Sequence, residues 1–158
     1  MHTYAVNSGI TGKCKMKIPS NAVTTWITPR VSETDGCGHI NNTTLPVWFE
    51  AGRREFFRAV SPGLSFDGWN LAVVSMRLDF RRQIYLADEV KIETWVSKIG
   101  NKSISVSEIA LQNDNICTAG ECSYVFFDYK TQKSEIVPEA IRQRLSFMVC
   151  ESERALTP

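Results

Sequence analysis

The chain has 158 residues, of which 43% are hydrophobic and 22% charged, the composition of an ordinary globular protein. Its 18 basic and 17 acidic side chains leave a formal net charge of +1, which excludes the one-sided basic surface of a dedicated nucleic-acid-binding protein. We expect a single domain with its own core, and no segment approaches the roughly 20 apolar residues of a membrane-spanning helix. Nucleic acid and membranes are therefore not expected as partners.

The cysteines indicate a reducing environment. They form an odd, scattered set without a Cys-x-x-Cys pair: Cys14, Cys37, Cys117, Cys122 and Cys150. This pattern favours free thiols in the cytoplasm and argues against a disulfide framework or a structural zinc site. Residues 1 to about 20 lack the apolar core of a secretory signal and are expected to be a leader or an edge segment. We predict a cytoplasmic protein without a metal or other cofactor.

The first half of the chain predicts a strand, a turn and a long helix. Residues 24–33 suit a short strand, which Pro29 would confine to a sheet edge or a bulge. The polar turn TDGCGHINN then leads into TTLPVWFEAGRREFFRAV, with Thr43 or Thr44 as the expected N-cap. One apolar face recurs at helical spacing: Leu45, Phe49, Gly52, Phe56 and Val60. Gly52 on this face predicts close approach to another backbone, and Ser61-Pro62-Gly63 should end the helix.

The second half changes to strand periodicity. Apolar and polar residues alternate in NLAVVSMRLDFRR and again in residues 90–96, and a Gly-Asn turn follows. Further strands are expected over residues 104–111 and 116–127, and a C-terminal helix over about 138–149. Consecutive hairpins imply an antiparallel sheet, and one amphipathic helix against it makes the class α+β. The short connections leave no room for βαβ crossovers.

Residues 33–42, ETDGCGHINN, are where chemistry is expected. They lead into the N-terminus of the long helix, where free amides and the helix dipole favour an anion. Such amides could stabilise the oxyanion that forms when a carbonyl is attacked, and Asp35 could attack it or deprotonate a water. Asp-Gly and Asn-Asn are also ordinary turn signals, and an aspartate before a helix is often only a cap. Residue types alone leave both readings open.

The stretch VSETDGCGHINNTTLPVWFEAGRREFF resembles the signature of 4-hydroxybenzoyl-CoA thioesterase-like proteins of the hotdog fold, approximately Asp-x-Asp-x-x-Gly-His-x-Asn-Asn followed by a helix with Glu-x-x-Arg. The matching positions are Asp35, Gly38, His39, Asn41, Asn42, Glu50 and Arg53. The resemblance covers about residues 22–130 and is similar to plant-type acyl-ACP thioesterases as well. It implies one domain over residues 1–158, with an antiparallel sheet of about five strands wrapped around one long central helix.

The resemblance also implies roles for these residues. Asp35 looks like the nucleophile or general base of thioester hydrolysis, and His39 and Asn41 like residues that orient substrate or water. The helix N-terminus would hold the oxyanion through a set of neighbouring positions: Gly38, Asn42 and Thr43. Three residues depart from the family pattern: Glu33, Leu45 and Pro46. Gln83 stands where acyl-ACP thioesterases carry a glutamate, so Gln83 and Glu50 are candidates for an assisting role.

The expected substrate is an acyl-CoA or an acyl group on acyl carrier protein. Four basic residues could bind phosphates of the carrier or be ordinary solvated charges: Arg81, Arg82, Lys98 and Lys102. The resemblance implies a homo-oligomer, a dimer or a tetramer, and pairing with a second chain would cover exposed sheet edges.

Two other functions remain open. A β-hydroxyacyl thioester dehydratase or hydratase would need a histidine base and an acidic partner, for which His39 and Glu50 are the candidates. The surroundings of His39 lack the proline-rich motif of those enzymes. A non-catalytic acyl-thioester-binding protein is the other alternative.

Overall fold

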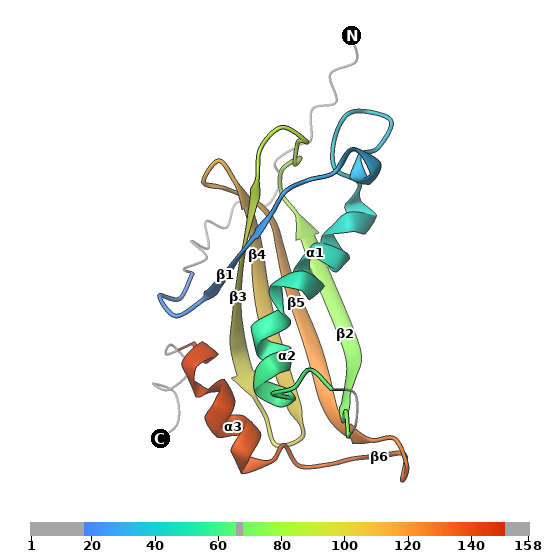
Figure 1. Cartoon of the computed structure of the whole chain (residues 1–158), viewed down its shortest axis with the longest axis vertical. Coiled ribbons are helices and arrows are strands. Elements are labelled where there is room, and N and C mark those ends of the chain that lie inside the picture. The colour runs from blue at the N-terminus through green and yellow to red at the C-terminus, as the bar shows by residue number, and fades with distance from the viewer. Residues whose placement is uncertain (1–17, 66–67, 151–158) are drawn as a thin grey trace.

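The computed structural model describes residues 18–65 and 68–150, and it forms one antiparallel sheet with helices on one face (Figure 1). The main strands lie in the order β1-β3-β4-β5-β2. Their bounds are β1 Val23–Ile27, β2 Leu71–Phe80, β3 Val90–Ile99, β4 Ser103–Gln112 and β5 Asn115–Asp128. A two-residue strand that the sequence did not predict, β6 Lys133–Ser134, pairs with the end of β5. The expected N-terminal segment falls almost entirely outside the described residues.

The central strands follow the predicted alternation. Val90, Ile92, Thr94 and Val96 of β3 are all fully buried, as a face packed against helices requires. On the opposite face, Trp95 is buried in a small apolar cluster with residues of β4. The turn between β4 and β5 contains Asn113 and Asp114, both with positive φ, which matches the right-handed twist of a tight hairpin. The predicted antiparallel α+β architecture is therefore confirmed.

The long helix begins as predicted in sequence position but is divided in two. A 3₁₀ turn at Asn42–Thr44 precedes α1 at Leu45–Gly52, and α2 follows at Arg54–Val60. The break falls at Arg53, whose guanidinium is buried and binds the Tyr124 hydroxyl and the Phe49 carbonyl. The Phe49 carbonyl accepts from both the backbone amide and the side chain of Arg53, and the backbone of Arg53, with a ψ of 5°, departs from helical geometry there.

Both helices pack their apolar face on the sheet. Leu45, Phe49 and Phe56 are buried, and α2 ends at Val60, directly before the predicted stop at Ser61. A methyl group placed on Gly52 would lie 2.7 Å from Ile92 Cγ2 and 2.8 Å from Thr94 Oγ1. Gly52 therefore packs tightly against β3, as a sheet against the helix was predicted to require, and its nearest groups there are side chains.

Two local predictions are wrong. The first strand ends at Ile27, and a 3₁₀ turn at Val31–Glu33 takes the place of its predicted second half, because Pro29 cannot donate to a sheet ladder. Thr44 precedes α1 but makes no capping bond with its side chain. The capping residue is Asn41, whose side-chain oxygen accepts from the amide of Thr43 at 3.0 Å.

The C-terminal helix is present and short. It comprises α3 at Glu139–Leu145 and a 3₁₀ turn at Ser146–Met148, close to the predicted 138–149. Its buried residues Ile141 and Leu145 join the core beside α2, at the end of the sheet far from the loop that precedes α1 (Figure 1). No helix in the described ranges is long and apolar enough to cross a membrane.

Candidate active site

The loop before α1 is folded into a tight turn around Asp35. The backbone pairs Thr34 with Ile40, and the amide of Asp35 donates to the His39 carbonyl at 2.7 Å. Gly38 has a φ of 85°, which a residue with a β-carbon rarely adopts, so glycine allows the chain to reverse here. The turn brings the side chains of Asp35 and His39 to the same side.

The carboxylate of Asp35 is held ionised. Its Oδ1 accepts hydrogen bonds from the amides of Cys37 at 2.8 Å and His39 at 3.1 Å, and these bonds lower the pKa of Asp35 below its ordinary value. Its Oδ2 lies 3.9 Å from His39 Nδ1. One carboxylate oxygen is thus fixed by the turn, while the other faces the imidazole. The turn-forming interpretation of Asp35 is therefore confirmed, and its chemical role stays a prediction.

Asp35 lines a pocket of about 760 Å³ between the loop, the start of α1 and the ends of the central strands. Among the residues predicted from the sequence, the pocket brings together six: Asp35, His39, Asn42, Arg81, Arg82 and Gln83. The two arginines follow β2, and both of their backbone amides donate to the carbonyl of Cys117 on β5, at 2.8 and 3.0 Å. This pair of hydrogen bonds to one carbonyl ends the strand and places both exposed arginine side chains at the pocket.

The start of α1 supplies fewer free amides than the sequence indicated. The amide of Thr43 is bound by the side chain of Asn41, and the amide of Thr44 by the Asn41 carbonyl at 2.9 Å. Gly38 belongs to the turn and does not line the pocket. Asn41 is therefore the capping residue and the Thr43 amide is the group that it caps, and Asn42, which does line the pocket, is the candidate whose amide could receive an oxyanion.

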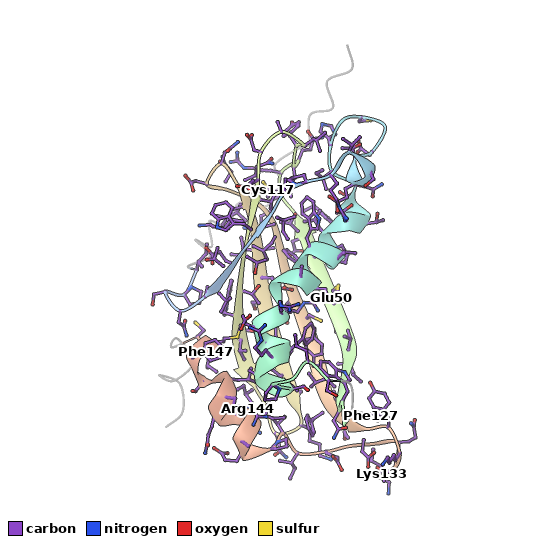
Figure 2. The ribbon with its side chains drawn as sticks, viewed as in Figure 1. Glu50, Cys117, Phe127, Lys133, Arg144 and Phe147 are labelled. Carbon is purple, nitrogen blue, oxygen red and sulfur yellow. The ribbon has the colours of Figure 1, made fainter. Side chains whose placement is uncertain are left out.

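Three other predicted residues lie away from the pocket. Lys98 and Lys102 flank the β3–β4 turn, and Lys102 donates to the Ser134 carbonyl at 2.9 Å. Gln112 lines the pocket and lies ten residues after Lys102 along β4. At the rise of an antiparallel strand, these ten residues separate Lys102 from the pocket by roughly 30 Å. Glu50 is exposed on α1, near the middle of the molecule and well away from Cys117 (Figure 2). Within one chain, these three residues therefore do not line the pocket that contains Asp35.

The pocket also contains residues that the sequence did not single out. They come from the end of β2, the segment after it, the β4–β5 hairpin and the first part of β5: Phe80, Ile84, Tyr85, Gln112, Asn113, Asn115, Cys117 and Thr118. The ring of Tyr85 meets the ring of His39 edge-on, with centroids 5.3 Å apart. In the sequence, Asn113 and Asn115 resembled ordinary turn residues. Strand pairing in the folded sheet brings their side chains to the same pocket as Asp35.

Cys117 is not suited to act as the nucleophile of this pocket. Its side chain lies at the upper end of the sheet in Figure 2 and is nearly fully buried. Burial raises the pKa of the Cys117 thiol, so the reactive thiolate is disfavoured. Among the described residues, no group of three or more histidine, cysteine, aspartate or glutamate side chains is arranged to hold a metal ion.

Glu33, which replaces the first aspartate of the resembling signature, anchors the loop. Burial would raise the pKa of Glu33, but hydrogen bonds from Arg30 and from the Trp48 indole at 3.2 Å lower it. The carbonyl of Glu33 accepts from the amide of Asn41 at 2.8 Å. Glu33 therefore links the loop to α1 by hydrogen bonds and helps to hold the loop in position.

A curled antiparallel sheet with helices on its inner face, and a pocket at the start of the first helix, defines a hotdog fold. Residues 29–145 match the model of the thioesterase-like superfamily, and the chain belongs to that superfamily.

Solved structures agree with this assignment. A predicted thioesterase from Bacillus stearothermophilus is 46% identical, with a TM-score of 0.79 over 81% of this chain and 96% of that chain. A thioesterase from Thermus thermophilus, complexed with coenzyme A and Zn, is 25% identical, with a TM-score of 0.73 over 84% and 96%. Among curated proteins, the uncharacterized protein YsmA of Bacillus subtilis (strain 168) is 30% identical over 80 residues. The match spans 51% of this chain and 54% of YsmA, so the chain covers about half the length of that relative.

Proposed function

We propose that the protein hydrolyses an acyl thioester to a free acid and a thiol. The proposal rests on the ionised carboxylate of Asp35, which lies at the wall of a pocket. The same pocket is lined by His39 and by Asn42, which begins the 3₁₀ turn before the first helix. In this mechanism either Asp35 attacks the thioester carbonyl and water then hydrolyses the resulting anhydride, or Asp35 deprotonates a water that attacks the carbonyl. In both routes the carbon–sulfur bond breaks, and the sulfur leaves as a thiolate that takes up a proton. The amide of Asn42 receives the negative charge that develops on the carbonyl oxygen. Membership of the thioesterase-like superfamily supports this reaction class.

We propose coenzyme A as the carrier, with acyl carrier protein as the alternative. The coenzyme A complex of the Thermus thermophilus relative supports this choice. In this chain Arg81 and Arg82 stand at the pocket, where their guanidinium groups could bind phosphates. Cys37, Cys117 and Cys122 are free thiols, which suits the reducing cytoplasm in which acyl-CoA is used.

A homo-oligomer is part of the same proposal. One edge of β2 is unpaired within the described chain, and that strand exposes several apolar side chains: Val73, Val74, Met76 and Phe80. An open edge with apolar residues is a surface that natural proteins usually cover. Phe80 also lines the pocket, so a second subunit on this edge would lie next to the site.

The dehydratase alternative is less well supported. The acidic partner that the sequence offered for His39 in that reaction is Glu50, and Glu50 does not line the pocket. An assay that follows enoyl formation together with thiol release would separate the two reactions.

The test is thiol release from a panel of aromatic, medium-chain and long-chain acyl-CoA and acyl carrier protein substrates, with the Asp35→Asn variant beside the wild type. Asparagine keeps the side-chain oxygen that accepts from Cys37 and His39, so the loop should remain folded. We expect the rate on the best substrate to fall at least about 100-fold, because a positioned acid or base usually contributes that much. Full activity of Asp35→Asn would refute the mechanism, and tight binding without thiol release by the wild type would favour a binding protein.

A further inference from the structure

Gln112 is a buried polar residue that the proposed reaction does not use. It ends β4 and is 6% exposed. Its side-chain amide makes three hydrogen bonds, and all three go to backbone atoms of the segment between β2 and β3. The oxygen accepts from the Tyr85 amide at 3.0 Å, and the nitrogen donates to the carbonyls of Tyr85 and Asp88, each at 2.8 Å. The side chain thus pairs with Tyr85 as a neighbouring strand would.

The same segment is bonded to the loop of the candidate site. Tyr85 forms an antiparallel bridge with His39, and the amide of Ile40 donates to the Ile84 carbonyl at 2.9 Å. The Tyr85 ring packs edge-on against the imidazole of His39. The position of His39, backbone and ring, therefore depends on a segment that Gln112 holds in place.

His39 in turn fixes Asp35. Its amide donates to Asp35 Oδ1 at 3.1 Å, and its carbonyl accepts from the Asp35 amide at 2.7 Å. The contacts form a continuous path from Gln112 through Tyr85 and His39 to the carboxylate. Each step is a hydrogen bond or a ring contact between groups that are adjacent in space.

We propose that Gln112 is a positioning residue of the site, which holds Tyr85 so that His39 and Asp35 keep their orientation. The inference rests on the proposed thioester hydrolysis for its kinetic consequence. It assigns to a residue of the β4–β5 hairpin control over a loop that lies more than 70 positions earlier in the sequence. Misplacement of reacting groups by about 1 Å can lower a rate about 100-fold, so a supporting bond of this kind has a measurable effect.

The first test is Gln112→Met, which keeps the length of the side chain and removes its three hydrogen bonds. We expect kcat to fall about 10- to 100-fold with a smaller change in KM, since the binding residues remain. The matched control is Leu145→Ala, a fully buried position on α3 at the far end of the sheet. At equal folded fractions the control should keep its kcat. Equal losses in both variants would mean that Gln112 acts only through stability and would overturn the proposal.

The second variant, Gln112→Glu, tests the same bonds through pH. In Gln112→Glu, an ionised carboxylate places an oxygen against the carbonyls of Tyr85 and Asp88, which accept from the amide nitrogen in the wild type. A protonated carboxyl group can instead donate a hydrogen bond to one of these carbonyls. Because Asp35 stays ionised in mild acid, the activity of Gln112→Glu relative to wild type should rise as the pH falls toward about 5. A ratio that stays constant with pH would count against the proposal.

A third measurement does not depend on any enzymatic activity. The chain contains two histidines, and the ring signal of His39 is identified in NMR spectra by its loss in His39→Gln. In Gln112→Met this signal should move toward the value of the unfolded chain as the contact with Tyr85 loosens, while Leu145→Ala should leave it in place. If the wild type releases no thiol from any substrate, the proposed function fails and this signal alone decides the role of Gln112. An unchanged His39 signal would overturn that role.

Discussion

At the scale of single residues, the site depends on how one carboxylate is solvated. Asp35 is about one-third exposed, yet two backbone amides bind one of its oxygens. Hydrogen bonds to the charged form favour ionisation, so the carboxylate exists in neutral and mildly acidic solution without a buried cationic partner. This environment suits a nucleophile or a general base, both of which need the ionised form.

The pH dependence of the reaction follows from this pKa. Because the pKa of Asp35 lies below its ordinary value of 3.8, the active carboxylate is present above that value and is lost only as the pH falls through the lowered pKa. We expect kcat/KM for thiol release to show no loss due to Asp35 between neutral pH and about pH 5. A pH–rate profile checks this, with Cys37→Pro as a variant that removes one of the two amides. That variant should move the acid limb to higher pH, and an unmoved limb would contradict the assignment.

At the scale of elements, the contact between α1 and β3 determines how closely the helix approaches the sheet. Gly52 lies against Ile92 and Thr94, so the helix approaches the sheet more closely than a larger residue would permit. The break at Arg53 follows immediately, and Arg53 Nε lies 3.3 Å from Glu108 Oε1 on β4. Burial raises the pKa of Glu108 to about 8, with Arg53 opposing that effect. A polar contact thus sits within the apolar core where the two helices meet.

Gly52→Ala should destabilise the protein although alanine is the better helix former. The added methyl group would overlap Ile92 Cγ2 and Thr94 Oγ1, and overpacking of a core typically costs about 1–3 kcal/mol, against a propensity gain of about 1 kcal/mol. Urea unfolding measures the change in the free energy of unfolding. The double variant with Thr94→Ala, which removes one of the two obstacles, should recover part of the loss. A Gly52→Ala protein as stable as wild type would contradict the close approach.

At the scale of the whole molecule, the exposed edge strand β2 is the candidate surface for contact between subunits. In Figure 1 this strand forms the right-hand edge of the sheet. Its apolar residues alternate as the sequence predicted, and Met76 lies opposite the buried Cys122, yet it remains 41% exposed. The pattern of a buried strand on an exposed edge is what an interface between subunits requires.

Val74→Lys tests that assembly. The side chain is 60% exposed, so lysine should not disturb the fold, but a charge on the edge should oppose association. Light scattering during size-exclusion chromatography should give a dimer or a larger assembly for the wild type and a monomer for Val74→Lys. Ile136→Lys, at a position that is 61% exposed outside β2, should behave as the wild type does. A monomeric wild type would refute the proposed oligomer.

The sequence by itself determined the order of the elements and the loop that contains Asp35. Both are local properties: side chains alternate along a strand, recur along a helix and signal turns through residues such as Gly38 and Asn113. The burial of Arg53 at the helix break could not be foreseen, because its guanidinium donates to the hydroxyl of Tyr124, 71 residues away.

Only the tertiary structure decided which side chains share the pocket. Strand order places the end of β2 and the β4–β5 hairpin beside the loop that contains Asp35. Tyr85 and Gln112 therefore line the pocket, whereas Lys98 and Lys102 lie at the other end of the sheet. The physical reason is that sheet register and helix packing are set by long-range burial of apolar surface. A polar residue at the end of a strand carries no local mark of the residues that it will face.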